Sequence, residues 1–277
     1  MRRKKKRCWI ALYLCGIFVI SAIAAGIIFI CRNHGEENNA ITPGGELAMS
    51  DVPASEEIYA DILDVFYYNI QNGWAEYNKR ISLYGYGGEV CFLFLRSFSD
   101  PSFIDSIGYS FIDFNGDGID ELLIGVDTEE EYQNIIYDLY TYMDGQIIHL
   151  ATSGERFFYQ LCEDNTIYYF GSGGAYVNLY YRYQLDLNEP VLSIVEGVYS
   201  EPDENQDICW YHSIFGIYNP ETHSWEREEP VVISEDEATV IRDSWPRRAD
   251  FPLTYFSEYT PDGNQNQNLT FQDILEK

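Results

Sequence analysis

Three oxygen-bearing side chains stand at alternate positions between Asp113 and Asp117, in the segment Asp-Phe-Asn-Gly-Asp. Calcium takes about six to eight oxygens, and a short loop can supply them from positions 1, 3 and 5, a carbonyl at 7 and a further group at 9. Gly118 falls at position 6, where the turn is sharp. We therefore predict a structural calcium (Ca²⁺) site whose ligands are Asp113, Asn115, Asp117, the carbonyl of Ile119 and Glu121.

The spacing leaves two readings open. Position 12 is Ile124, so the bidentate glutamate of an EF-hand is missing, and the run that follows Glu121 predicts a buried strand rather than a helix. Asn-Gly and Asp-Gly are also ordinary turn dipeptides, so a polar turn without an ion is the alternative. Against that alternative, the three carboxylates in nine residues repel one another unless a cation neutralises them.

The segment from Asp113 to Ile124 resembles the calcium loop of FG-GAP and VCBS-type repeat proteins, and more distantly the loops of dockerins. The resemblance implies the same five ligands. Integrin-like propellers repeat this unit many times, whereas this chain has a single copy, which argues against a propeller. The surrounding pattern is also similar to membrane-anchored surface proteins of Gram-positive bacteria, a similarity that implies no activity.

The N-terminal segment predicts a membrane anchor. Residues 2–7 are all Lys or Arg, and residues 8–31 are uncharged and rich in Ile, Ala, Leu and Phe. A helix of that length spans about 36 Å, enough for a hydrocarbon core of ~30 Å. We predict a cytoplasmic basic tail at 1–7, a single-pass signal anchor at 8–31 and an extracellular C-terminal domain. Cleavage after Ala22-Ile-Ala24 is the competing interpretation.

The charge distribution limits the partners. Of 17 Lys and Arg, seven precede residue 33, so the rest of the chain sets ten basic residues against all 45 acidic ones. Such an acidic domain repels nucleic acid and anionic membrane surfaces and attracts cations. Beyond the membrane segment the cysteines are Cys91, Cys162 and Cys209, an odd count for which we expect free thiols.

The remaining pattern predicts an α+β fold, mainly an antiparallel β meander with two packed helices, preceded by one transmembrane helix. Residues 32–54 form a flexible spacer, 55–260 the extracellular domain, and 261–277 a polar, mobile C-terminal tail. The first helix starts at a Ser55 cap and stops at Asn72-Gly73, and the second follows the capping box Ser234-Glu-Asp-Glu237. Residues 90–95 fit either a buried strand or a short core helix.

Successive hairpins account for the region after residue 130. The expected strands are 135–142, 146–151, 156–161, 166–170, 176–185, 191–198, 208–218 and 224–228, and residues 171–174 are expected to form a turn. The many strand tyrosines fit either cross-strand packing or a platform for sugars. The leading hypothesis is a surface domain that binds or scaffolds a cell-wall glycan or a surface protein. The alternative is a hydrolase of glycan or peptide that uses acid pairs such as Asp203/Glu204 or Glu228/Glu229.

Overall fold

The computed structural model describes residues 53–75, 77, 90–128, 134–187, 189–219, 224–227, 229–261 and 270–275. The predicted basic tail, the predicted transmembrane helix and all but the end of the predicted spacer lie outside these residues. In the part of the chain that the structure does describe, no helix is long and apolar enough to cross a membrane.

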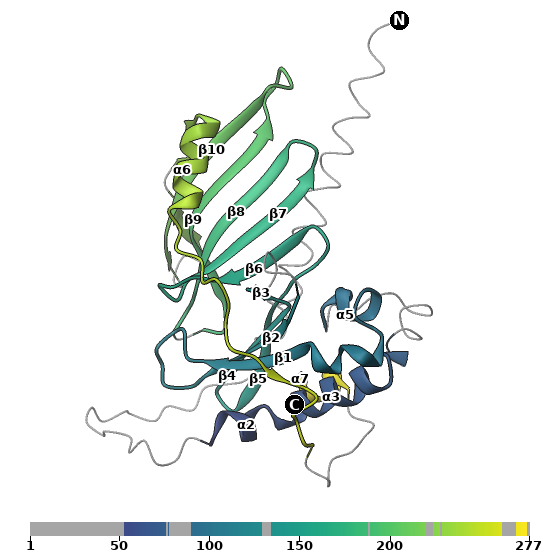
Figure 1. The fold of residues 1–277 in the computed structure, drawn as a ribbon. Helices are drawn as coiled ribbons and strands as arrows, with labels where there is room; N and C mark the ends of the chain where they lie inside the picture. Colours follow the sequence, from purple (N-terminus) through teal and green to yellow (C-terminus); the bar gives the residue numbers. More distant parts are fainter. Residues whose placement is uncertain are drawn as a thin grey trace, which may run out of the picture. The chain divides into compact units, whose positions relative to one another are not determined.

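The domain is α+β and consists mainly of two antiparallel sheets (Figure 1). Its helices are α2 (Ser55–Ile58), α3 (Ala60–Gln71), α5 (Phe92–Arg96), the 3-10 helix η1 (Pro101–Asp105), α6 (Glu235–Asp243) and α7 (Phe271–Leu275). Most helices gather around the smaller sheet, whereas α6 lies along the larger one.

The smaller sheet has five strands in the order β13-β1-β2-β4-β5. These strands are β1 (Ile107–Ile112), β2 (Glu121–Val126), β4 (Asp138–Met143), β5 (Gln146–Thr152) and β13 (Thr254–Tyr255). β1 and β2 pair in full register, from Ile107 opposite Val126 to Ile112 opposite Glu121. The predicted hairpin at Asp144-Gly145 is confirmed, with φ of 53° and 82° at the two turn residues.

The larger sheet follows the order β11-β10-β9-β8-β7-β6-β3, with β12 also paired to β10. Its strands are β3 (Ile135–Ile136), β6 (Phe157–Leu161), β7 (Ile167–Gly174), β8 (Val177–Leu185), β9 (Leu192–Pro202), β10 (Ile208–Asn219), β11 (Ser224–Arg227) and β12 (Val231–Ile233). From β6 to β11 every strand pairs with the next along the chain, so the predicted meander is confirmed here.

The chain passes between the two sheets at Tyr137 and Ser153. The expected single strand 135–142 is therefore wrong: Ile136 pairs in the larger sheet and Asp138 in the smaller one. Ser153 connects these two crossing points by hydrogen bonds: its backbone N–H donates to Tyr137 O (2.9 Å), and its hydroxyl donates to Ile136 O (2.6 Å). Side chains of both sheets meet beside this point in a buried cluster of Phe114, Leu123, Ile136, Leu139, Ala151, Leu161, Ile167, Leu185 and Phe251.

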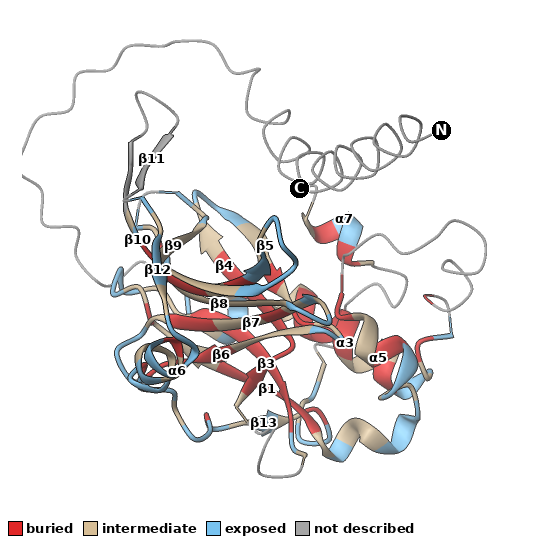
Figure 2. Cartoon of the chain, turned by 90° about the horizontal axis from the view of Figure 1, so that it is seen from above, coloured by how far each residue is buried: buried red, intermediate tan, exposed pale blue. Residues whose placement is uncertain are grey.

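The main core lies between α3 and the smaller sheet, where Figure 2 shows many of the buried residues. Phe66 is fully buried and contacts the rings of Trp74, Phe94, Tyr140, Phe256 and Phe271 with centroid separations of 4.9–6.5 Å. Of the two structures that residues 90–95 could adopt, the helix is found: residues 92–95 belong to the short helix α5, and its Phe94 stacks on Trp74.

Three local expectations were wrong. Ser55 does not cap the first helix; its hydroxyl bonds instead to Asp120, and the helix is divided at Tyr59. Residues 171–174 are the end of β7 rather than a turn. The predicted polar tail contains α7, whose Phe271 and Ile274 are buried in the main core. The capping box of α6 is confirmed in both of its hydrogen bonds.

Candidate functional site

The predicted calcium loop connects β1 to β2 at the end of the smaller sheet. Its turn is fixed by side chains that accept backbone N–H groups. Asp113 accepts from Gly116 N through Oδ1 (2.7 Å) and from Gly118 N through Oδ2 (3.0 Å). Both glycines have positive φ, 81° and 89°, and so meet the conformational demand of the turn.

Two further oxygens curl over the same turn. Asn115 Oδ1 accepts from Asp117 N (3.0 Å), and Asp117 Oδ1 accepts from Ile119 N (2.8 Å). Asp113, Asn115 and Asp117 therefore lie together on one compact loop, with Asp117 exposed and the other two half-buried. Because each carboxylate oxygen has about two lone pairs, one backbone bond leaves it able to bind a further partner.

Glu121 differs from the other predicted ligands because it is fully buried. It begins β2, and its carboxyl accepts from Phe114 N (3.3 Å) and from the Thr141 hydroxyl (3.1 Å). Burial, together with the nearby charges of Asp117 and Asp113, raises its pKa to about 8, although the two hydrogen bonds act in the opposite direction. A buried acid beside two other acids is the arrangement that a bound cation would relieve.

The oxygen donors suit calcium, but within the described residues they do not converge on one position where an ion could sit. Among the described residues, no three His, Cys, Asp or Glu side chains are placed to hold one metal ion. The loop oxygens instead face backbone N–H groups, and Asn115 Nδ2 donates to Asp117 Oδ2 (3.1 Å). Ion binding would require these side chains to turn their remaining lone pairs toward one another.

Sequence reasoning missed the residues that connect the loop to the first helices. Ser55 donates to Asp120 Oδ2 (2.6 Å), and the Tyr59 hydroxyl donates to the Asp120 carbonyl (2.9 Å). Burial, followed by the charges of Glu121, Asp120 and Asp117, raises the pKa of Tyr59. No local signal could reveal these contacts, because more than 60 residues separate the partners.

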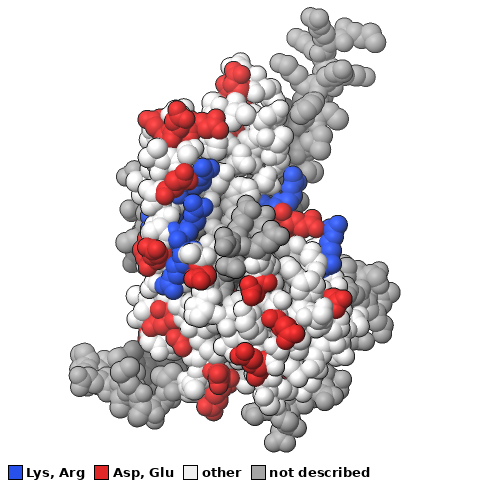
Figure 3. Space-filling view, in the orientation of Figure 1, with Lys and Arg blue, Asp and Glu red and all other residues white. Residues whose placement is uncertain are grey.

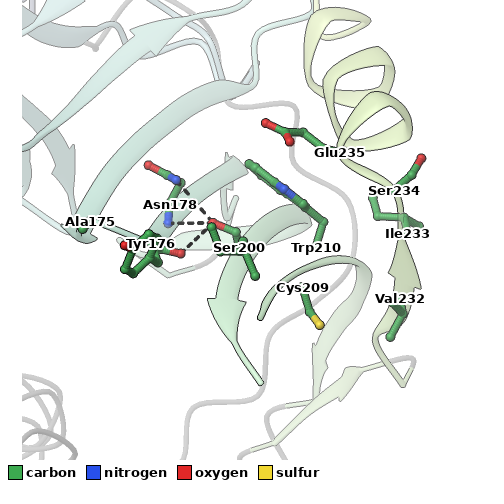
Figure 4. A pocket seen from close by; sticks show the side chains of 11 residues that line it. Ala175, Tyr176, Asn178, Ser200, Cys209, Trp210, Val232, Ile233, Ser234 and Glu235 are labelled. Atoms are coloured by element: carbon green, nitrogen blue, oxygen red, sulfur yellow. Dashed lines mark hydrogen bonds between the residues drawn. The ribbon is translucent and has the colours of Figure 1, made fainter. Parts of the chain in front are cut away.

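A second candidate site is a pocket of about 340 Å³ at one end of the larger sheet (Figure 4). It lies where β8, β9, β10 and β12 meet the start of α6, and its lining comprises Ala175, Tyr176, Asn178, Ser200, Ile208, Cys209, Trp210, Val232, Ile233, Ser234 and Glu235. The Ser200 hydroxyl is held by two hydrogen bonds: it donates to Tyr176 O (3.1 Å) and accepts from the backbone N–H of Asn178 (3.1 Å).

The hydrolase alternative needs two carboxyls across a cleft. Among the described residues, Glu235 is the only acid in the lining of this pocket. The half-buried Asp203 accepts the backbone N–H groups of Asn205 and Asp207. Glu228 lies outside the described residues.

A buried group near the main core could also suggest nucleophilic chemistry. His149 Nε2 lies 2.9 Å from Asp138 Oδ1, and Cys91 N donates to Asp138 Oδ2 (2.8 Å). However, Asp138 touches the backbone of Cys91 rather than its thiol, and burial raises the pKa of that thiol. A protonated, fully buried thiol is a structural group. Cys91 and Cys162 are buried free thiols, as expected, whereas Cys209 is half-buried.

The strand tyrosines pair across the larger sheet, as the packing interpretation expects. Tyr169 stacks on Tyr181 (6.0 Å) and Tyr199 on Tyr211 (5.2 Å). On the opposite face, beside α6, the Arg242 guanidinium lies 4.8 Å from the centre of the Tyr180 ring. Figure 3 shows the few basic side chains of this view gathered mainly in one stripe and the acidic ones widely spread.

Comparisons with known proteins add no assignment to this geometry: the chain matches no protein-family model, no curated protein and no solved structure.

Proposed function

We propose that this chain is a membrane-anchored, extracellular binding or scaffolding domain whose β1–β2 loop holds a structural calcium ion. The ligands would be Asp113, Asn115, Asp117, the Ile119 carbonyl and Glu121. The observation that carries this proposal is the buried carboxyl of Glu121, placed where Asp117 and Asp113 both act on it. Divalent charge at that point would favour the ionised form of the Glu121 carboxyl.

The ion would act as a cross-link within the fold. Glu121 pairs with Ile112 at the mouth of the β1–β2 hairpin, so a cation bound there would hold the ends of both strands. Asp120, next to Glu121, carries the bonds from Ser55 and Tyr59. Calcium would therefore stabilise the hairpin and the contact of α2 and α3 with the loop, without taking part in a reaction.

The anchor and the orientation rest on the sequence. The six basic residues before the uncharged stretch 8–31 favour a cytoplasmic N-terminus and an extracellular acidic domain in the cell membrane. Extracellular calcium sites commonly bind at about 10⁻⁴–10⁻³ M, which matches a surface loop whose Asp117 is exposed. The partner would be a cell-wall glycan or a surface protein.

Calorimetric titration tests the metal site directly. Full-length chain in detergent, freed of metal by chelation, is titrated with calcium chloride and, separately, with magnesium chloride. We expect saturable heat with calcium in the range of about 0.1–1 mM and weaker heat with magnesium, because Mg²⁺ demands a stricter octahedral geometry. An absence of heat with calcium at millimolar concentration would show that the loop is a turn without an ion.

A further inference from the structure

The pocket beside α6 combines one free carboxylate with apolar walls. Glu235 is the only charged residue in the lining, and within the described residues its exposed carboxylate makes no hydrogen bond or ion pair. Glu237 of the same turn does have such a role, because it closes the capping box with Ser234. Glu235 is thus available to an external partner.

An indole forms one wall of this pocket. In Figure 4, Trp210 and Glu235 lie on one side, and Asn178 and Tyr176 lie on the other. The Tyr180 ring stacks on Trp210 with a centroid separation of 6.3 Å and an angle of 21°, which fixes the orientation of the indole. The electron-rich faces of indole and phenol rings attract cations, and most strongly where water is excluded.

The rim of the pocket is aliphatic and open to solvent. Ile208 is 48 % exposed and Val232 is 65 % exposed, and both line the pocket together with Tyr176, which is 57 % exposed. Large apolar side chains concentrated at the edge of a pocket mark an interaction surface. They would cover the methylene stem of a long side chain whose charged end reaches inward.

The charge of the chain selects the sign of the ligand. The described residues of the lining include no Lys, Arg or His, and the whole chain carries a formal charge of −28. Three acids, Glu235, Asp236 and Glu237, occupy the first turn of α6 and outweigh the positive end of its dipole. An anionic ligand would meet repulsion both locally and at long range, whereas a cation would be attracted.

We propose that this pocket binds a cationic side chain, lysine or arginine, from a basic segment of a partner protein. The charged end would contact the Glu235 carboxylate and the Trp210 ring, and the stem would lie on Ile208 and Val232. This inference goes beyond the proposed function, because it names a binding site and a partner chemistry in the sheet that does not contain the calcium loop.

Small blocked amino acids test the proposal on the full-length chain in detergent. The cationic probes are Nα-acetyl-lysine N-methylamide and Nα-acetyl-arginine N-methylamide, and the neutral probe is the norleucine analogue, which keeps the four carbons of the lysine side chain and lacks its ammonium group. Binding is followed by ligand-observed saturation-transfer NMR and by calorimetry. We expect one or both cationic probes to bind, with an affinity that falls as salt is added, and the neutral probe to bind at least about tenfold more weakly.

Two substitutions in the same helical turn separate contact from general charge. Glu235→Gln should weaken the cationic probes by about tenfold, while Asp236→Asn, which removes the same charge outside the lining, should leave them within about twofold. Tyr176→Ala, at an exposed position, gives a second variant that should weaken binding several-fold. Circular dichroism checks that each variant is folded.

Three outcomes would overturn the proposal. The first is equal binding of the norleucine analogue, and the second is an unchanged affinity in Glu235→Gln. The third is binding of the neutral sugar N-acetylglucosamine without binding of either amino-acid probe, which would assign the pocket to a glycan. The pocket and the β1–β2 loop belong to different sheets, so probe binding should be equal in calcium and in chelator. A failed calcium titration would therefore leave this result standing.

Discussion

The Ser55 hydroxyl donates a 2.6 Å hydrogen bond to the Asp120 carboxylate, joining the first turn of α2 to the loop between β1 and β2. The Tyr59 hydroxyl reaches the carbonyl of the same residue. Asp120 is not one of the proposed ligands, yet it lies between Ile119 and Glu121, which are. The position of the first helices is thereby coupled to the conformation of the loop.

The first prediction concerns calcium and Asp117. Asp117→Asn keeps the volume of the side chain and an oxygen for Ile119 N, but it removes a charge that the ion needs. For the native chain, calcium at 100 times its Kd should add about 2.7 kcal/mol to the free energy of unfolding, or roughly 5–10 °C in Tm. Differential scanning calorimetry should show most of this gain lost in the variant.

Asp203→Asn is the matched control for that experiment. Asp203 accepts turn N–H groups in the same way but lies between β9 and β10, away from the loop. Its variant should retain the full calcium-dependent rise in Tm. Equal melting of Asp117→Asn and native protein in calcium and in chelator would contradict the assignment.

The second prediction concerns pH without calcium. Folding raises the pKa of Glu121 from an ordinary value of 4.5 to about 8. Between these values the folded state binds the extra proton, so the free energy of unfolding falls as pH rises, by an amount on the order of a few kcal/mol. The contribution is complete below about pH 4.5 and is lost through about pH 8.

Urea unfolding in chelator at several pH values measures this effect. Glu121→Gln removes the titrating group, so its free energy of unfolding should fall less steeply than that of the native chain between pH 5 and pH 8.5. Calcium requires the carboxylate, so added calcium should be more stabilising at pH 8.5 than at pH 5.5. Parallel pH profiles for the two proteins would argue against a protonated Glu121.

The third prediction concerns the helix-to-loop contact. Tyr59→Phe keeps the ring stacked on Phe111 and removes only the hydroxyl that donates to Asp120. We expect a loss of about 1 kcal/mol in the free energy of unfolding, and a similar loss for Ser55→Ala. Tyr255→Phe, which removes an exposed hydroxyl bonded to Asp127, should cost less. If all three variants lower the free energy of unfolding by the same amount, the contact with Asp120 stabilises the fold no more than an exposed hydrogen bond does.

The fourth prediction concerns α7. Phe271 is fully buried and its ring lies 4.9 Å from that of Phe66, so Phe271→Ala should cost about 3–5 kcal/mol by cavity formation. Leu187→Ala, at a side chain that is 56 % exposed, should change stability by less than about 0.5 kcal/mol. Urea titration distinguishes them. A loss below about 1 kcal/mol for Phe271→Ala would indicate that α7 contributes little to the stability of the core.

The sequence predicts what local chemistry determines. The glycine turn at Asp144-Gly145 and the capping box at Ser234 have short-range signals, and both were found, whereas the glycine-rich turn expected at 171–174 was not. The same reasoning missed α7, because the polar run 264–268 suggested a tail. The sequence nevertheless carries a signal. Thr270 and Asp273 have the spacing of a capping pair and exchange hydrogen bonds in the structure, and Phe271 and Ile274 are spaced to share one helix face.

Long-range relationships were the other omission. No sequence feature near Tyr137 or Ser153 predicts that the chain changes sheets there, because the change depends on which strands lie next to each other in the folded protein. The bond of Ser55 to Asp120 likewise replaces a local N-cap with a tertiary contact. Such choices are settled by packing between distant segments, which a single sequence does not display.

The contact of α7 with α3 has a consequence for biosynthesis. The Phe271 ring of α7 lies 4.9 Å from the Phe66 ring of α3, and Tyr259, which precedes α7, donates to Asp64 of α3 across 195 positions. The hydrophobic centre built around Phe66 is thus sealed only after nearly the whole domain has emerged. A nascent chain would carry an unfinished interior throughout elongation, and chaperone protection would matter most before residue 275 is added.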